Sequence, residues 1–162
     1  ALVLVDITPH MDPGGVDAIQ GFMRAKAQDG FASIEEAADA VAAYLPHRPR
    51  PKSLEGLKRN LRQSADGRWR WHWDPLFLDG PRPVSHDGEN FVLMAEAASC
   101  SLRVPTLLVR GQSSELVTDY AAQKFKALVP HSEFADIAGA RHMVAGDRND
   151  AFTDAIFHFL KA

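Results

Sequence analysis

The stretch VPTLLVRGQSSELV, residues 104–117, decides the fold of this chain of 162 residues. It opens with a short, almost uniformly apolar run that begins through Pro105 and ends at Gly111. Such a run predicts a strand that is buried on both faces, as in parallel sheets. The polar segment behind it carries Glu115. The pattern therefore places a carboxylate just beyond the carboxyl end of a buried strand.

Two other segments have a similar pattern. ALVLVDITP, residues 1–9, predicts a second buried strand, and SEFADIAGA, residues 132–140, predicts a third with a weaker pattern. Behind the third strand, GARHMV presents His142 on a glycine-bounded turn. Ligands of open α/β sheets bind beyond the carboxyl ends of the strands. We therefore expect His142 to act as a general base with Glu115 as its acid partner; the alternative is a surface glutamate and a loop histidine.

The order of the expected elements predicts an α/β fold. Helices are expected at residues 118–129 and 149–160, each directly following one of the last two strands. Short crossovers of this kind imply about three parallel strands with flanking helices. We expect residues 1–9 and 101–162 to form the core, and residues 10–100 to be a helical cap or lid inserted over the strand ends.

Aromatic residues mark a pocket within the expected cap. Trp69, Trp71 and Trp73 alternate with polar residues, and a period of two predicts an extended segment with an aromatic face. We expect this face to line an apolar substrate pocket; the alternative is that it belongs to a local core. His10, on the turn after the first strand, is expected to face the mouth of the active site.

These motifs resemble the C-terminal part of an α/β-hydrolase fold enzyme. Residues 1–9 resemble the strand that follows the nucleophile helix, and residues 104–117 resemble the strand and turn that carry the catalytic acid. Residues 139–152, GARHMVAGDRNDAF, resemble the turn with the catalytic histidine and its following helix. The resemblance implies a nucleophile–histidine–acid triad in which Glu115 is the acid and His142 is the base. The acid of this family is more often Asp, and Glu is an accepted variant.

The nucleophile of that triad is missing from the sequence. It typically lies in a G-x-S-x-G turn before the other two members, and the sequence has no G-x-S-x-G, G-x-D-x-G or G-x-C-x-G. Asp87 in SHDG does not follow a strand, and Cys100 is interpreted as a buried structural thiol. The resemblance therefore implies a nucleophile in a missing N-terminal half. A serine there would favour esters or lactones, and an aspartate would favour epoxides.

Composition narrows the classes of partner. The net charge of −3 argues against nucleic acid, and no apolar run is long enough to cross a membrane. One cysteine allows no internal disulfide and favours the cytoplasm. The sequence has no metal-ligand spacing and no glycine-rich phosphate loop, so we expect no metal and no cofactor.

Two functions are thus expected from the sequence. The first is hydrolysis of a small, apolar ester, lactone or epoxide, with the nucleophile supplied from outside this chain. The second is a non-catalytic fragment or assembly module, which forms homo-oligomers through the exposed edge of the first strand.

Overall fold

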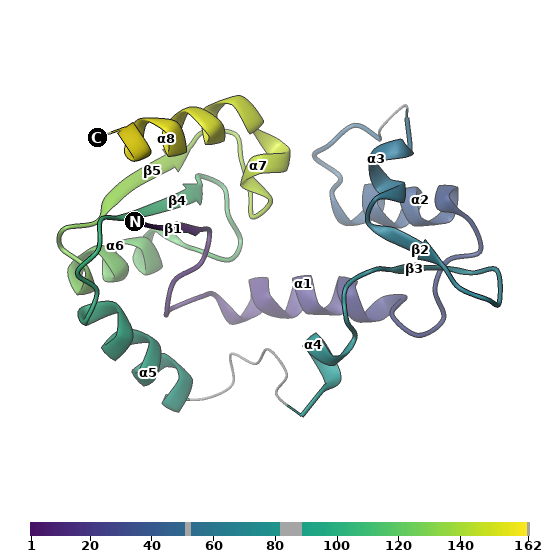
Figure 1. Ribbon diagram of the computed structural model, residues 1–162, viewed down its shortest axis with the longest axis horizontal. Helices are drawn as coiled ribbons and strands as arrows, with labels where there is room; N and C mark the ends of the chain where they lie inside the picture. The colour runs from purple at the N-terminus through teal and green to yellow at the C-terminus, as the bar shows by residue number, and fades with distance from the viewer. Residues whose placement is uncertain (51–52, 82–88, 162) are drawn as a thin grey trace. The chain divides into compact units, whose positions relative to one another are not determined.

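The computed structural model describes residues 1–50, 53–81 and 89–161 and divides the chain into two compact units (Figure 1). One unit comprises Ala1–Asp17 and His86–Ala162, and the other comprises Ala18–Ser85. The sequence placed the boundaries of an inserted cap at residues 10 and 100. The structure groups the segments just inside both boundaries with the sheet, and the role of the second unit as a cap stays a prediction.

The first unit contains the parallel sheet that the sequence predicted. Its strands are β1 (Leu2–Val5), β4 (Thr106–Gly111) and β5 (Glu133–Ile137), paired in the order β1-β4-β5. Both pairings are parallel, with Leu2 opposite Thr106 and Leu107 opposite Glu133. Every residue of the central strand β4 is buried. An α/β fold with three parallel strands is therefore confirmed.

Helices cover both faces of this sheet. Leu107 and Val109 pack on the side of α8 (Asn149–Lys161) and α7 (Val144–Asp147), whereas Leu108 between them points to the opposite face. That opposite face carries α6 (Asp119–Leu128), and α5 (Glu89–Cys100) lies beside α6 (Figure 1). The core on the α8 side consists of Leu107, Val109, Ile137, Ala140, Val144 and Phe159.

The second unit is helical apart from one hairpin. The side chain of Ser33 accepts a hydrogen bond from the N–H of Glu36 and so caps its longest complete helix. The elements are most of α1 (Pro13–Ala25), α2 (Ile34–Tyr44), α3 (Glu55–Lys58), β2 (Leu61–Gln63), β3 (Trp69–Trp71) and α4 (Leu76–Asp79).

The tryptophan segment forms half of that hairpin. β3 pairs antiparallel with β2, and Trp69 also pairs with Phe31 through an isolated bridge. Trp69 and Trp71 pack against the buried cluster of Phe31, Ala37 and Leu61. The ring of Trp71 meets the Phe31 ring edge-on, with 5.3 Å between centroids. The segment is thus extended as predicted, and its first two tryptophans occupy the local core that was the alternative to a substrate pocket.

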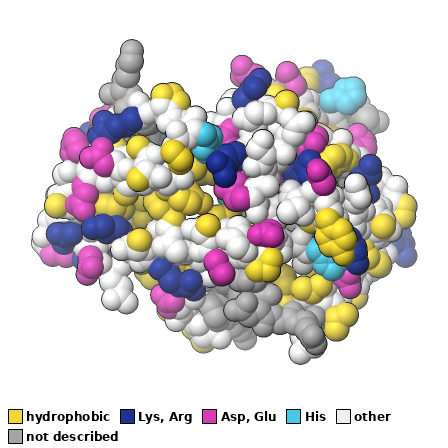
Figure 2. Space-filling view, turned by 180° about the vertical axis from the view of Figure 1, so that it is seen from behind, with side chains coloured by type: hydrophobic (Ala, Val, Ile, Leu, Met, Phe, Trp, Pro, Cys, Tyr) yellow, Lys and Arg dark blue, Asp and Glu magenta, His cyan; other side chains and the backbone are white. Residues whose placement is uncertain are grey.

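Charged side chains of both signs are interspersed on the face of the molecule shown in Figure 2. Several charged side chains of the described residues form ion pairs, for example Arg50 with Asp39 at 2.9 Å and Lys26 with Glu36 at 2.9 Å. Among the described residues, no helix is both long enough and apolar enough to cross a membrane.

Candidate active site

Asp6 lies at the carboxyl end of β1 and is completely buried. Its N–H continues the ladder by donating to the carbonyl of Val109 at 2.7 Å. The backbone then turns sharply, because Asp6 has a φ of 51°, and it is the one residue other than glycine with a positive φ in the described part of the chain. Aspartate adopts this left-handed conformation more readily than most residues. The turn directs the carboxylate across the end of β4.

His142 comes from the loop after β5. Gly139, with a φ of 72°, turns the chain behind that strand. The N–H of Arg141 then donates to Oδ2 of Asp147 at 2.9 Å, and the carbonyl of His142 accepts from the N–H of Val144 at 2.9 Å. The loop that holds the imidazole is therefore fixed to the short helix α7. The side chain of His142 is 31% exposed.

The carboxylate of Asp6 and the imidazole of His142 are in contact. Oδ2 of Asp6 lies 2.9 Å from Nδ1 of His142, although the two residues are far apart in the sequence. A buried carboxylate in this position holds the proton on Nδ1, which leaves Nε2 as an acceptor. Within the described part of the chain, Nε2 makes no hydrogen bond. The pair therefore has the arrangement of a general base with its orienting acid.

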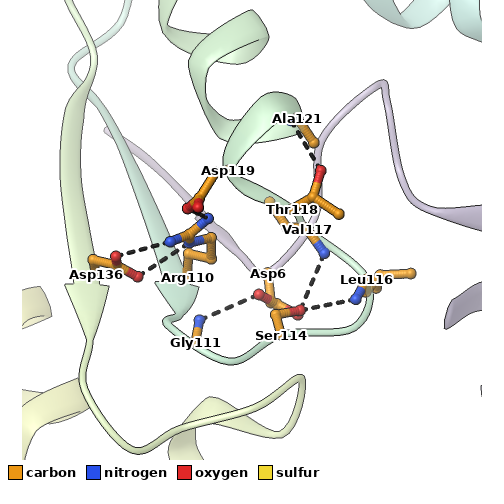
Figure 3. Close-up of polar contacts among 10 residues, drawn as sticks. All are labelled: Asp6, Arg110, Gly111, Ser114, Leu116, Val117, Thr118, Asp119, Ala121 and Asp136. Atoms are coloured by element: carbon orange, nitrogen blue, oxygen red, sulfur yellow. Dashed lines mark hydrogen bonds and ion pairs between the residues drawn. The ribbon is translucent and has the colours of Figure 1, made fainter.

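The loop after β4 surrounds the same carboxylate. The N–H of Gly111 donates to Oδ1 of Asp6 at 3.3 Å, and the hydroxyl of Ser114 donates to Oδ2 at 2.7 Å (Figure 3). Gly111 is required at its position, because a Cβ there would lie 2.2 Å from the carbonyl oxygen of Arg141. Its lack of a side chain allows the loops after β4 and β5 to meet around Asp6.

Glu115, the acid partner that the sequence assigned, makes a different contact. Its Oε2 accepts from Nε of Arg141 at 3.3 Å, beside the histidine instead of on it. The physical reason is that Asp6 follows β1, which is the neighbour of β4 in the sheet. From this position its carboxylate reaches the imidazole of His142. The structure thus moves the candidate acid from Glu115 to Asp6.

Arg110 holds the strands together at this end of the sheet. Its guanidinium is 4% exposed and forms two hydrogen bonds with Asp136 of β5, at 3.0 and 2.8 Å, and one with Asp119 of α6, at 2.5 Å (Figure 3). These bonds raise the pKa of Arg110 above its usual value; the contact with Asp136 has the largest effect. Arg110 is therefore a permanent cation that joins β4 to β5 and α6.

The other described residues that the sequence singled out have different surroundings. Nε2 of His10 lies 2.8 Å from Oε1 of Glu96 on α5, without the alignment of a hydrogen bond. Trp73 follows β3 and is half-buried. Cys100 is exposed, so its interpretation as a buried thiol is wrong. Asp87 lies outside the described residues.

An apolar cavity of about 270 Å³ lies on the α6 side of the sheet. It is bounded by β1, the loop after it, α5 and Phe125 of α6, and neither Asp6 nor His142 lines it. The hydroxyl of Thr8 is buried at its wall without a hydrogen-bond partner in the described part of the chain. No cluster of three or more potential metal ligands occurs among the described residues.

Asp6 was not predicted as a site residue, although the sequence contains a signal for it. The expectation that polar groups beyond strand ends form the site pointed to Glu115 and His142. It applies equally to ALVLVD, in which Asp6 is the first polar residue after an apolar run. Ser114 gave no separate signal, because one serine beside another in a loop is common.

Two known proteins that match nearly the whole chain are named as an esterase and a hydrolase. The chain is 27% identical over 165 residues to the 2-(acetamidomethylene)succinate hydrolase of Mesorhizobium japonicum, covering 100% of this chain and 55% of that protein. It is 26% identical over 166 residues to the esterase Rv0045c of Mycobacterium tuberculosis, covering 96% of this chain and 50% of that protein. The chain thus spans about half the length of these relatives. No family model matches the sequence.

A solved structure has the same fold. The crystal structure of E-2-(acetamidomethylene)succinate hydrolase superposes with a TM-score of 0.80 at 24% identity, over 99% of this chain and 57% of that one. The similarity therefore extends through both compact units.

Proposed function

Because the chain belongs to the α/β-hydrolase fold superfamily, we propose that it supplies the base and the orienting acid of a hydrolase site. His142 is the general base and Asp6 is the acid in this proposal. The nucleophile comes from a segment outside the sequence, which has no G-x-S-x-G turn.

The observation that carries the proposal is the 2.9 Å contact between Nδ1 of His142 and the buried Oδ2 of Asp6. A carboxylate on one imidazole nitrogen fixes the tautomer and stabilises the imidazolium that forms during turnover. The His142 side chain is 31% exposed, as a group that must meet a substrate requires. Glu115 is less suited to the role, because the guanidinium of Arg141 occupies its carboxylate.

The proton path follows from this geometry. Nε2 of His142 takes the proton of a serine hydroxyl while the serine oxygen attacks the carbonyl carbon of an ester. The imidazolium, held by Asp6, then gives that proton to the leaving alcohol. In the second half of the reaction, Nε2 takes a proton from water, which attacks the acyl group, and returns it to the serine oxygen as the acid product leaves.

We assign a carboxylic ester as the substrate class. The relatives named an esterase and a succinate-derivative hydrolase support this choice, and both names are compatible with attack at an acyl carbon. Epoxide opening, in which the nucleophile is an aspartate, stays the alternative.

A chimera tests the proposal. The first half of the Mesorhizobium japonicum hydrolase, up to the matched region, is joined to this chain, and hydrolysis of short 4-nitrophenyl esters is measured. We expect turnover that His142→Ala lowers by at least about a hundredfold. His158→Ala is the matched control, because this histidine lies exposed on α8. Turnover that survives His142→Ala would contradict the proposal, as would a folded chimera that hydrolyses no esters.

One observation favours assembly as a second function. β1 pairs only with β4 in the described sheet, so its other edge is open. The N–H groups of Leu2 and Asp6 donate toward β4, and by alternation those of Val3 and Val5 point to the open edge. Unpaired strand edges recruit other strands, and we propose that a second copy of this chain binds there.

A further inference from the structure

The hydroxyl of Ser114 has one possible direction for its proton. Its oxygen accepts hydrogen bonds from the N–H of Leu116 at 3.0 Å and of Val117 at 3.1 Å. A serine hydroxyl has two acceptor sites and one donor. With both acceptor sites occupied, its proton points to Oδ2 of Asp6, 2.7 Å away (Figure 3).

That bond acts on the atom that holds the histidine. Oδ2 of Asp6 faces both the hydroxyl of Ser114 and Nδ1 of His142, while Oδ1 accepts the longer bond from Gly111 at 3.3 Å. Without Ser114, the backbone N–H of Gly111 is, among the described residues, the remaining donor besides the imidazole that orients this buried carboxylate. Hydrogen bonds to ionised groups are short and strong, so the 2.7 Å contact is the main constraint on carboxylate rotation.

The same contacts exclude Ser114 as the missing nucleophile. Its hydroxyl faces the carboxylate instead of the imidazole, and both acceptor sites are used by backbone amides. A nucleophilic serine needs its proton directed at a base that can carry it away.

We propose that Ser114 is a positioning residue: its hydroxyl fixes the Asp6 carboxylate and, through it, the tautomer and orientation of His142. This rests on the proposed function, which gives the Asp6–His142 pair its catalytic meaning.

The test measures the Nδ1 proton of His142 in this chain, without any hydrolysis. Histidine labelled with ¹⁵N is incorporated, the His142 signals are identified by their loss in His142→Gln, and exchange of the Nδ1 proton with water is followed. Ser114→Ala is expected to accelerate exchange at least about tenfold, the factor that corresponds to losing one hydrogen bond to a charged group. Ser113→Ala is the matched control, because its side chain is exposed in the same loop, and should leave exchange unchanged.

Two further variants separate positioning from a general loosening of the loop. Ser114→Cys keeps the shape of the side chain but donates weakly, so its exchange rate should lie between those of wild type and Ser114→Ala. It also serves as the measured variant if Ser114→Ala does not fold. In the Asp6→Asn background, Ser114→Ala should have no further effect on the imidazole, because its effect passes through the carboxylate.

The outcomes distinguish this proposal from the proposed function. A wild-type His142 without a proton on Nδ1 would overturn the Asp6–His142 pair and both proposals with it. A wild-type Nδ1 proton whose exchange is the same in Ser114→Ala or, failing that, Ser114→Cys overturns the role of Ser114 alone. An equal acceleration by Ser114→Ala in the Asp6→Asn background also overturns it.

Discussion

Asp6 and His142 come from opposite ends of the chain and meet at 2.9 Å, at the carboxyl ends of two strands that flank β4. The central strand separates β1 from β5, so the loop behind β4 has to let the two side chains approach. Gly111 and Ser114 make this possible, the first by its lack of a side chain and the second by its bond to the carboxylate.

Replacing Gly111 with alanine should destabilise the fold. A Cβ at this position would lie 2.2 Å from the carbonyl oxygen of Arg141, which is backbone and cannot rotate away. We expect a loss of about 1–3 kcal/mol in the free energy of unfolding, as for other overpacked sites, measured by urea denaturation. Gly21→Ala is the control: it lies in α1 with open space around it and should stabilise by about 0.5–1 kcal/mol. Equal stability of the two variants would contradict the close approach of the two loops.

The two carboxylates on Arg110 should contribute unequally. Asp136 is 30% exposed and binds the guanidinium through both oxygens, whereas Asp119 is 84% exposed. We expect Asp136→Asn to lower the free energy of unfolding by about 1–3 kcal/mol and Asp119→Asn by less than about 0.5 kcal/mol. Thermal and urea unfolding of both variants measure the difference. A larger loss for Asp119→Asn would show that the bond to α6, and not the one between strands, is the important one.

The turn of the β2–β3 hairpin should retain its ion pair in acid. Arg70 and the N–H of Arg68 bind the Asp66 carboxylate and lower its pKa to about 2 from 3.8. A carboxyl group whose pKa is lower in the folded state than in the unfolded state stabilises the fold at pH values above its unfolded pKa. For Asp66 this contribution is lost as the pH falls from 3.8 toward about 2. The loss of stability in Asp66→Asn should therefore disappear below pH 2. A ¹³C titration of the carboxyl group measures the pKa directly, and a midpoint near 3.8 would rule out the pair.

Assembly through the edge of β1 should depend on the amide of Val3. Proline is tolerated on edge strands where the lost N–H faces outward, so Val3→Pro is expected to weaken any self-association. Val3→Thr keeps the amide and a similar shape, and serves as the control. Sedimentation at increasing concentration measures both. Identical association of the two variants, or a monomer throughout, would mean that this edge does not join copies of the chain.

The strands β1 and β4 were predictable because their signals are local, although only β4 is buried throughout. Residues 2–5 and 106–111 are apolar runs closed by polar or glycine residues, and the helices behind β4 and β5 have clear apolar faces. The hairpin was harder, since its strands are three residues each. Leu54, Leu57 and Leu61 have a helical spacing, yet α3 ends at Lys58 and Leu61 begins β2.

The candidate site was predictable in part for a different reason. The turn that presents His142 is encoded in neighbouring residues, whereas the choice of its carboxylate depends on which loop reaches the ring in three dimensions. Glu115 and Asp6 both follow strands of the parallel sheet, and no feature of the sequence ranks one carboxylate above the other. Arg141 decides between them by binding Glu115, and its role as a partner of that carboxylate is visible only in the folded chain.

The tautomer of His142 in wild type, Asp6→Asn and Glu115→Gln is the most direct test of the central claim that Asp6 orients the base. The ¹⁵N chemical shifts of the two ring nitrogens report which one carries the proton. We predict a proton on Nδ1 in wild type and Glu115→Gln, and a shift of the proton to Nε2 in Asp6→Asn, where the new amide can donate to Nδ1. A tautomer that changes in Glu115→Gln and persists in Asp6→Asn would contradict the account and return the acid role to Glu115.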